Sequence, residues 1–224
     1  QLSSRLPKGA LFHMGVSNTR RCWNMFQLPE SVESACNVGC CGIDGCVSTL
    51  VGASLVNPDR LCYVVVGDLT FFYDLNSLGN HHIGTNLRVM LVNNGRGTEF
   101  RLGIHHCNVF GDDADKYMAA AGHFGNKSPL LVKHYAEDLG FHYLSATTKE
   151  EFMTALSNFT NPQLSDHSMI LEVFTDSKDE SEALYLMSHI QSDAKGMVRS
   201  KLKDAVRNVA GEKGINAIKK ILKK

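Results

Sequence analysis

Two apolar runs near the middle of the chain enclose a stretch with helical character. The first run, Leu61 to Val66, ends in Gly67-Asp68, and the second, Leu87 to Val92, ends in Asn93-Asn94. The residues between them can form one helix, from Thr70 to about Leu78, and a return loop. Two buried strands joined by a helix are typical of a βαβ unit with parallel strands. Its right-handed crossover brings the carboxyl ends of both strands to the same edge of the sheet.

The same alternation of apolar and polar positions continues on both sides of this unit. It predicts strands over residues 11–17, 141–143 and 168–174, and helices over residues 18–26, 46–55, 130–139, 149–159 and 178–190. Alternating strands and helices indicate an α/β fold with a doubly wound, mostly parallel sheet and helices on both faces. We interpret residues 1–10 as a linker and residues 101–128 as a mobile loop with a short helix from Lys116 to Ala121.

The composition changes after residue 194, so we divide the chain into a domain of residues 1–194 and a tail of residues 195–224. The tail holds ten Lys and Arg residues and an apolar stripe at helical spacing, which predicts a basic amphipathic helix. We expect this stripe to pack on a neighbouring domain or subunit. Contact with an anionic membrane surface or with nucleic acid is the less favoured alternative.

Composition narrows the class of protein. The 224 residues suffice for one core with an appendage, and a net charge of zero with 43% hydrophobic residues excludes a disordered chain and a generally basic nucleic-acid binder. No apolar run approaches the roughly 18 residues of a membrane span. The chain begins with Gln1 rather than Met, so its natural N-terminus is expected elsewhere. Seven cysteines, an odd number, favour reduced and buried thiols in a cytoplasmic protein.

Polar residues follow both central strands where these end. The Asp68 carboxylate and the Asn94 side-chain carbonyl are hard oxygen ligands, which Mg²⁺ prefers together with phosphate oxygens. The predicted helix also offers free backbone N–H groups at Leu69 and Thr70, where an anion can bind. The edge of the sheet therefore predicts a site for a metal-bridged diphosphate.

The pair Gly67-Asp68 and Asn93-Asn94, at a step of 26 residues, resembles the signature of thiamine-diphosphate enzymes. Together with the upstream Gly42-Ile43-Asp44-Gly45, it most resembles the synthases of this family that serve menaquinone biosynthesis. The resemblance implies that thiamine diphosphate and Mg²⁺ bind to the residues of these motifs. The implied cofactor-binding residues are Gly42, Ile43, Asp44, Gly67, Asp68, Leu69, Thr70 and Asn94. The implied metal ligands are Asp68, Asn94 and the backbone carbonyl of Arg96.

The resemblance also implies a reaction. In such synthases a 2-oxo acid, 2-oxoglutarate, is decarboxylated and the remaining acyl unit is added to isochorismate. The stretch from Gly15 to Arg21 matches the family's substrate-binding pattern, which places Ser17 and Arg21 at the carboxylate end of the 2-oxo acid. Ile43 matches the large aliphatic residue that supports the thiazolium ring, although an ordinary core residue remains an alternative.

Two stretches depart from the menaquinone-pathway pattern. Asn37-Val38-Gly39 lacks the arginine that the synthases carry before their Gly-Ile-Asp-Gly motif, and residues 95–101 look more like simple 2-oxo-acid decarboxylases. The alternatives are therefore a plain 2-oxo-acid decarboxylase or carboligase subunit, or a non-catalytic scaffold with the same fold. The pairs His105-His106 and Asp112-Asp113 are interpreted as surface loop rather than as metal ligands.

One required group is missing. The family's catalytic glutamate lies on a separate pyrimidine-binding domain, and no catalytic residue is predicted in this chain. We therefore expect the isolated chain to be inactive. Its expected partner is a pyrimidine-binding domain or subunit of the same enzyme, in a homodimer or tetramer that buries the helix of small residues from Cys46 to Leu55.

Overall fold

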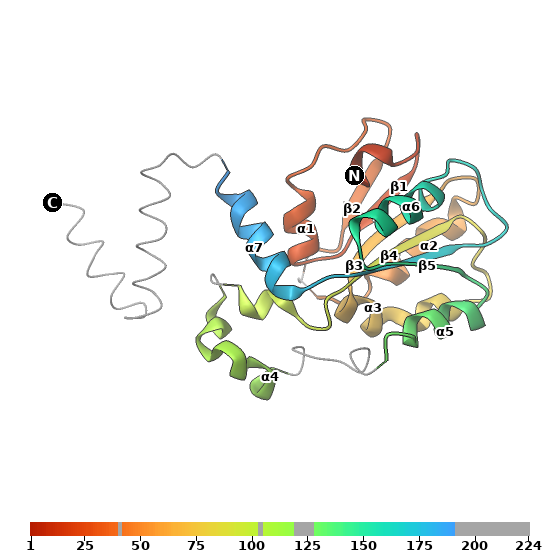
Figure 1. The fold of residues 1–224 in the computed structure, drawn as a ribbon. Coiled ribbons are helices and arrows are strands. Elements are labelled where there is room, and N and C mark those ends of the chain that lie inside the picture. Colours follow the sequence, from red (N-terminus) through yellow and green to blue (C-terminus); the bar gives the residue numbers. More distant parts are fainter. Residues whose placement is uncertain (40–41, 103–104, 119–127, 191–224) are drawn as a thin grey trace.

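Six parallel strands form one sheet. The computed structural model describes residues 1–39, 42–102, 105–118 and 128–190, with the sheet order β2-β1-β3-β4-β6-β5 (Figure 1). The strands are β1 (Leu11–Met14), β2 (Glu33–Cys36), β3 (Cys62–Gly67), β4 (Leu87–Asn93), β5 (His142–Ala146) and β6 (Met169–Phe174). Every neighbouring pair is parallel, which confirms the predicted doubly wound α/β fold.

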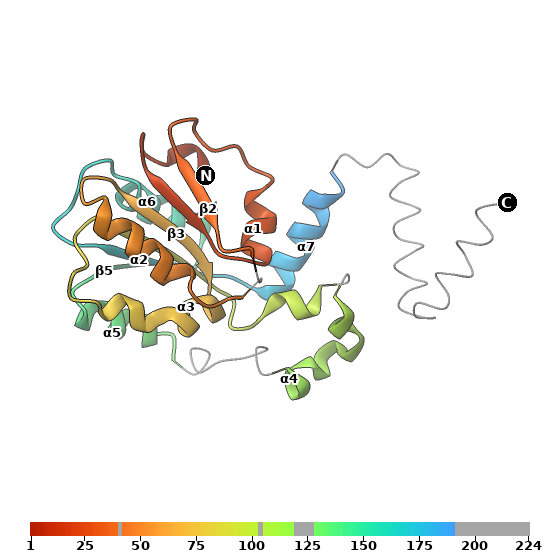
Figure 2. The ribbon, with the colours of Figure 1, turned by 180° about the vertical axis from the view of Figure 1, so that it is seen from behind.

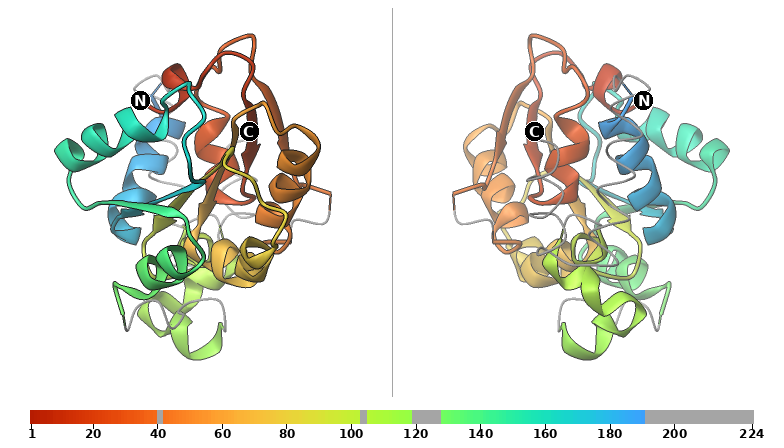
Figure 3. Two further views of the ribbon diagram at one scale, coloured as in Figure 1. Left: turned by 90° about the vertical axis from the view of Figure 1, so that its right-hand side faces the viewer. Right: turned by 90° about the vertical axis from the view of Figure 1, so that its left-hand side faces the viewer.

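Helices cover both faces of the sheet (Figure 3). The α-helices are α1 (Asn18–Trp23), α2 (Cys46–Val56), α3 (Asp68–Asp74), α4 (Ala114–Tyr117), α5 (Leu131–Asp138), α6 (Lys149–Phe159) and α7 (Ser177–Ser188). Short 3-10 helices are η1 (Ser3–Arg5), η2 (Leu75–Gly79), η3 (Thr98–Arg101) and η4 (His106–Asp113). The helix expected from Thr70 to about Leu78 is thus two pieces, α3 and η2. The predicted helix at residues 116–121 lies earlier, as α4, and its last three residues are outside the described part.

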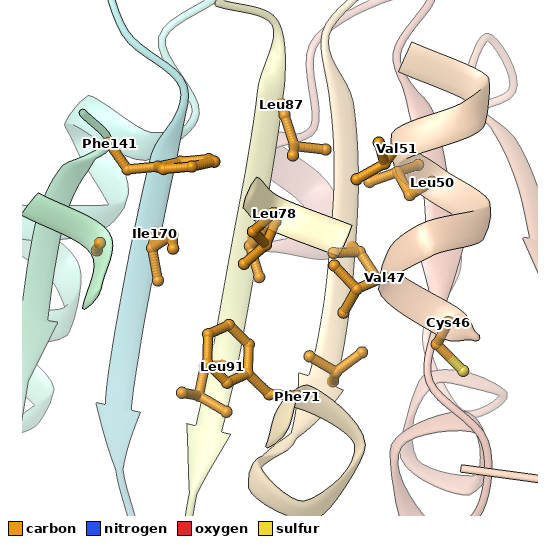
Figure 4. Packing of buried hydrophobic residues seen from close by; sticks show 14 of the residues in the cluster. Cys46, Val47, Leu50, Val51, Phe71, Leu78, Leu87, Leu91, Phe141 and Ile170 are labelled. Carbon is orange, nitrogen blue, oxygen red and sulfur yellow. The ribbon is translucent and has the colours of Figure 1, made fainter. Parts of the chain in front are cut away.

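The first face of the sheet is covered by α2, α3 and α5. Side chains of these helices pack on the alternate residues of β3, β4 and β6 that point toward them (Figure 4). This cluster includes Val47, Leu50, Phe71, Leu87, Leu91 and Ile170, each no more than 2% exposed. Asp74, the last residue of α3, accepts a hydrogen bond from the Ser48 backbone N–H in the first turn of α2, at 2.7 Å. The two helices are thereby joined at the start of α2.

The second face is covered by α6 and, unexpectedly, by the N-terminal segment. Leu2, Leu6 and Ala10 are buried in a cluster with strand residues and with Leu156 and Phe159 of α6. The interpretation of residues 1–10 as a linker is therefore wrong, because three apolar side chains of this segment belong to the core. Trp23 of α1 also packs against this cluster.

The order in which strands are added to the sheet reverses at β1. It leaves β1 through α1 toward β2, and returns through α2, on the other face, to β3 on the opposite side of β1 (Figure 2). In open α/β sheets, ligands bind in the crevice at the carboxyl ends of the strands that flank such a point. The fold therefore predicts a ligand site at the carboxyl ends of β1 and β3.

Several remaining predictions can be compared with the structure. Strand β2 was not predicted, because three of its four residues are exposed at the sheet edge and show no apolar run. Helix α6 has the predicted bounds, and a capping box formed by Thr148 and Glu151 marks its start. Residues 105–113, expected as loop, contain η4. In the described part of the chain, no helix is long and apolar enough to cross a membrane. The predicted tail of residues 195–224 lies outside the described residues.

The cysteines of the described segments are all free thiols. They are Cys22, Cys36, Cys46, Cys62 and Cys107. Cys46 and Cys62 are fully buried, and burial raises the pKa of Cys62 to about 11, so this thiol stays protonated at neutral pH. Buried thiols agree with the prediction for these two residues, whereas Cys22, Cys36 and Cys107 are only half-buried.

One histidine lies inside the sheet. His13 of β1 is 4% exposed and pairs with Ala35 of β2 and Val64 of β3. Within the described residues, no hydrogen-bond partner exists for its Nε2 atom. Burial lowers the pKa of His13, and a hydrogen bond with the Asn37 side chain offsets part of this effect. The folded protein therefore holds this imidazole in its neutral form.

We predict that His13 makes the fold sensitive to acid. A histidine with a lowered folded-state pKa contributes stability that is present above the unfolded-state pKa, near 6.5, and is lost as the pH falls toward the folded-state pKa. The free energy of unfolding in urea should therefore decrease between about pH 7 and about pH 5. His13→Gln should reduce this slope, whereas His134→Gln, at an exposed position of α5, should retain it. An unchanged slope in His13→Gln would contradict the prediction.

Candidate functional site

A pocket of about 730 Å³ opens at the carboxyl edge of the sheet, at the expected switch point. Its wall is built from α1, from the ends of β3 and β4, from the loop of residues 94–100, and from one side of α7. Figures 1 and 2 show α1 and α7 next to each other at this edge. The volume lies in the range of small-molecule binding sites. Of the predicted site residues, the pocket is lined by Ser17, Arg21, Ile43, Gly67, Asp68, Leu69, Thr70, Asn94 and Arg96.

Asp68 lies where β3 passes directly into α3. It is 2% exposed, and its Oδ1 atom accepts the Leu69 backbone N–H at 2.9 Å. The preceding Gly67 has open space where a Cβ atom would lie, so the backbone leaves room for a ligand beside the carboxylate. Leu69 and Thr70 follow in the first turn of α3 and are buried. Buried charges in proteins are usually paired or coordinate metal ions, so this carboxylate in the pocket wall is a candidate cation ligand.

Asn94 follows β4 and has partners on both ends of its amide. Its Nδ2 atom donates to Thr98 Oγ1 at 2.8 Å and to Glu180 Oε2 at 2.7 Å. Its Oδ1 atom accepts the Arg96 backbone N–H at 3.1 Å, so residues 94–96 form a tight turn. Because two acceptors hold the nitrogen, the orientation of the carbonyl oxygen is determined.

Glu180 was not predicted as a site residue. It lies in the first turn of α7, and its carboxylate accepts hydrogen bonds from Thr175 and Asn94. Burial raises the pKa of Glu180; the two hydrogen bonds oppose this shift, while the negative charges of Asp68 and Asp176 add to it. A carboxylate 112 positions beyond Asp68 thus reaches the same site. Only the β6–α7 connection, which no local pattern reveals, places it there.

A second buried network supports the loop from the other side. Asn93 Nδ2 donates to Glu172 Oε1 at 2.7 Å, and the Tyr143 hydroxyl donates to Glu172 Oε2 at 2.7 Å. Asn93 Oδ1 accepts the Gly95 backbone N–H at 3.2 Å. Glu172 is 1% exposed. The network connects β4, β5 and β6 and determines how the chain leaves β4 toward Arg96.

The two predicted substrate residues belong to α1, with Ser17 at its N-cap and Arg21 in its last turn, and both line the pocket. Arg21 donates to Asn18 Oδ1 at 2.9 Å and forms an ion pair with Glu99 of η3, with 2.6 Å between Nη2 and Oε1. Ser17 has φ 66° and ψ −130°, and it is the one residue other than glycine with positive φ in the described segments. Such a conformation is sterically costly for a residue with a Cβ atom, and strained residues cluster at functional sites.

The Gly-Ile-Asp-Gly motif is only partly in the pocket. Ile43 lines it and also packs against the first core cluster, so its two proposed roles are compatible. Asp44 is exposed, and neither Asp44 nor Gly42 is a lining residue. Gly45 has φ 80°, a left-handed conformation that favours glycine at the start of α2.

His105, interpreted as surface loop, also lines the pocket, and its Nδ1 atom accepts the Cys107 backbone N–H at 3.1 Å. Within the segments that the structure describes, no group of three His, Cys, Asp or Glu side chains is arranged to hold a metal. The oxygen set of Asp68, Asn94 and the Arg96 carbonyl is of a different type, because it mixes one carboxylate with amide oxygens. Such a mixture suits Mg²⁺, which completes its shell with water and phosphate oxygens.

The fold is an α/β domain with a pocket at the switch point of a parallel sheet, the place where ligands bind in folds of this class. No protein-family model matches the chain. Curated relatives do. The chain is 34% identical to the 2-succinyl-5-enolpyruvyl-6-hydroxy-3-cyclohexene-1-carboxylate synthases of Bacteroides fragilis, Phocaeicola vulgatus and Christiangramia forsetii, over 183, 187 and 184 residues.

These alignments cover 82% of the chain but 30–31% of each relative. The chain thus spans about a third of the length of the synthases it matches. The predicted resemblance to the synthases of the menaquinone pathway is confirmed by these relatives.

We predict that the strain at Ser17 can be relieved. A glycine adopts φ 66° and ψ −130° without steric cost, so Ser17→Gly should raise the free energy of unfolding by about 1 kcal/mol. Ser17→Ala keeps the Cβ atom and is the matched control, which should leave stability nearly unchanged. Urea unfolding of the three proteins measures both effects. Loss of stability in Ser17→Gly would show that the hydroxyl group contributes more than the backbone strain costs.

Proposed function

We propose that this chain is the diphosphate- and Mg²⁺-binding domain of a thiamine-diphosphate-dependent enzyme. In the proposed reaction, 2-oxoglutarate loses CO₂ and the remaining acyl unit is added to isochorismate, a step of menaquinone biosynthesis. The observation that carries the proposal is the convergence of Asp68, Asn94 and Arg96 on one pocket at the switch point of the sheet. The similarity to named synthases supports the same reading.

The residues of the pocket have distinct proposed tasks. Asp68 and Asn94 offer side-chain oxygens to Mg²⁺, and the Arg96 backbone carbonyl is the third protein ligand. Glu180 and Thr98 hold the Asn94 nitrogen, so the amide oxygen keeps its direction during binding. The Thr70 backbone N–H, in the first turn of α3, would donate to phosphate oxygens. The Leu69 N–H, predicted to be free, is instead taken by Asp68 Oδ1.

Recognition of the substrate is proposed for the residues of α1 and its N-cap. The guanidinium group of Arg21 presents a planar fork of donors, which matches the two oxygens of a carboxylate. With Ser17 it would bind the distal carboxylate of 2-oxoglutarate, while Ile43 supports the cofactor ring. Bound thiamine diphosphate would supply the electron sink for cleavage of the bond next to the 2-oxo group.

The proposal requires a second component. The glutamate that activates the cofactor in such enzymes belongs to a pyrimidine-binding domain, which the chain would meet within the same polypeptide or in another subunit. The site would then lie between the two, in a homodimer or tetramer. The exposed side of α2, which carries Ser48, Thr49 and Gly52, permits the close approach that such an interface needs.

A plain 2-oxo-acid decarboxylase or carboligase is the second candidate. It is favoured by Val38, an exposed apolar residue where the menaquinone-pathway synthases carry an arginine. With that cation replaced, Arg21 would carry recognition of a distal carboxylate alone. A preference for pyruvate over 2-oxoglutarate would select this candidate. A non-catalytic scaffold would show no Mg²⁺-dependent diphosphate binding at all.

The first test concerns the metal site. Inorganic pyrophosphate stands in for the diphosphate, and calorimetry with the 224-residue chain should detect binding that requires Mg²⁺. Asp68→Ala removes the only carboxylate among the three proposed ligands, so affinity should fall at least about tenfold, or 1.4 kcal/mol. Asp59→Ala, at an exposed turn before β3, is the matched control and should bind like wild type. Equal affinities for Asp68→Ala and wild type would reject the site.

The second test concerns catalysis. The purified 224-residue chain, supplied with thiamine diphosphate and Mg²⁺, should release no CO₂ from 2-oxoglutarate or pyruvate, because the activating glutamate is expected on another domain. Addition of a pyrimidine-binding fragment from one of the related synthases is expected to restore release. Turnover by the chain alone would mean that an activating group lies within it.

A further inference from the structure

The ion pair between Arg21 and Glu99 connects two segments that line the pocket. Arg21 comes from α1, after β1, whereas Glu99 comes from η3, after β4, and 78 positions separate them. The side chains are 33% and 26% exposed, and both residues line the pocket. The pair therefore joins two walls of the site rather than two parts of the core.

This pair contributes little to the stability of the fold by itself. Partly exposed ion pairs are typically worth less than about 1 kcal/mol, because solvent screens them and ordering the side chains costs entropy. It acts on a ligand as well, because Glu99 presents to Arg21 the same chemical group that an anionic ligand would present. A ligand carboxylate can use the Arg21 fork only after the Glu99 carboxylate has left it.

We infer that Glu99 determines the selectivity of the pocket, by competing with the distal carboxylate of a dicarboxylic 2-oxo acid for Arg21. The inference rests on the role proposed for Arg21. Glu99 weakens binding of a dicarboxylate and leaves binding of a monocarboxylic 2-oxo acid, which makes no contact with Arg21, unchanged. Glu99 thereby reduces the difference in affinity between dicarboxylic and monocarboxylic 2-oxo acids.

The size of the effect follows from the population of the open state. When a binding-competent state is populated only in part, the apparent dissociation constant rises by the inverse of that fraction. An ion pair of this strength is open about one fifth of the time and weakens dicarboxylate binding about fivefold. Neutralising Glu99 removes this penalty. Removing Arg21 instead removes the guanidinium group for which Glu99 and the ligand carboxylate compete.

Trp23 provides a direct measurement. It is the single tryptophan of the chain, lies two residues after Arg21 in α1, and lines the same pocket. Its fluorescence can be followed while 2-oxoglutarate or pyruvate is added to the 224-residue chain. Glu99→Gln keeps the shape of the side chain and removes its charge, and Glu99→Ala is a second variant that removes the side chain altogether.

Glu99→Gln and Glu99→Ala should each bind 2-oxoglutarate about fivefold more tightly than wild type, with pyruvate binding unchanged. Arg21→Ala combined with Glu99→Gln should abolish the gain. Glu33→Gln, which breaks the remote Arg60–Glu33 pair of 2.8 Å, is the matched control and should bind like wild type. Binding of 2-oxoglutarate that is unchanged, weaker or undetectable in both Glu99 variants would overturn the inference.

This result is separable from the proposed function. Mg²⁺-dependent binding of pyrophosphate tests the cofactor site and does not involve Arg21 or Glu99. If pyrophosphate binds but the Glu99 variants gain nothing, the inference fails and the proposed cofactor site stands. If the variants gain affinity for 2-oxoglutarate without any pyrophosphate binding, Glu99 controls an anion pocket and the proposed function fails.

Discussion

The hydrogen-bonded register between β3 and β4 is the constraint on which the site depends. Gly67 pairs with Val92, so the two strands end within one residue of each other. Asp68 and Asn94 follow at the same edge because both strands are parallel and of similar length. A slip by one residue would turn the side chains of β4 to the opposite face and separate the two groups. The alternate burial of Leu87, Val89 and Leu91 under α2 and α3 prevents such a slip.

The same register organises two layers of polar contacts around an apolar pocket. One layer holds Asn94 through Thr98 and Glu180, and the other holds Asn93 through Glu172. Apolar residues such as Trp23, Met90 and Leu184 form much of the remaining wall. Charges placed against such walls interact more strongly than they would in water. The site therefore combines a polar edge, where the proposed cation ligands lie, with a largely apolar chamber that presents few groups to the proposed anionic ligand.

The hydrophobic pattern of the sequence predicted the part of the site that is formed by the consecutive elements β3, α3 and β4. The two apolar runs around residues 61–92 sufficed for β3, the start of α3 and β4, because buried parallel strands are continuously apolar. Edge strand β2 was not predicted because three of its four residues are exposed. The burial of residues 1–10 was not predicted because three buried apolar side chains in ten residues show no clear period. Both errors concern segments whose burial is decided by distant parts of the chain.

The site residues that only the structure revealed are likewise placed by distant parts of the chain. Glu180 and Glu99 reach the site through the path of the chain after β6 and β4. No motif surrounds Glu180, and the stretch of residues 95–101 did not single out Glu99 as a site residue. Motifs also placed too much in the site: Asp44, part of Gly-Ile-Asp-Gly, is exposed outside the pocket. Sequence spacing thus places polar residues that directly follow strands in the pocket, whereas tertiary contacts decide which distant charges face them.

The contact between Asn94 and Glu180 restricts which amino acids can occupy position 94. Aspartate would serve a magnesium ion as well as asparagine does, but it has no N–H to donate to Glu180. It would place a second carboxylate against a glutamate whose pKa is already raised by burial and by the nearby Asp68. Positions 94 and 180 are therefore coupled: an acidic residue at one is compatible only with a donor at the other, and evolutionary exchange at either is expected to require a compensating exchange at its partner.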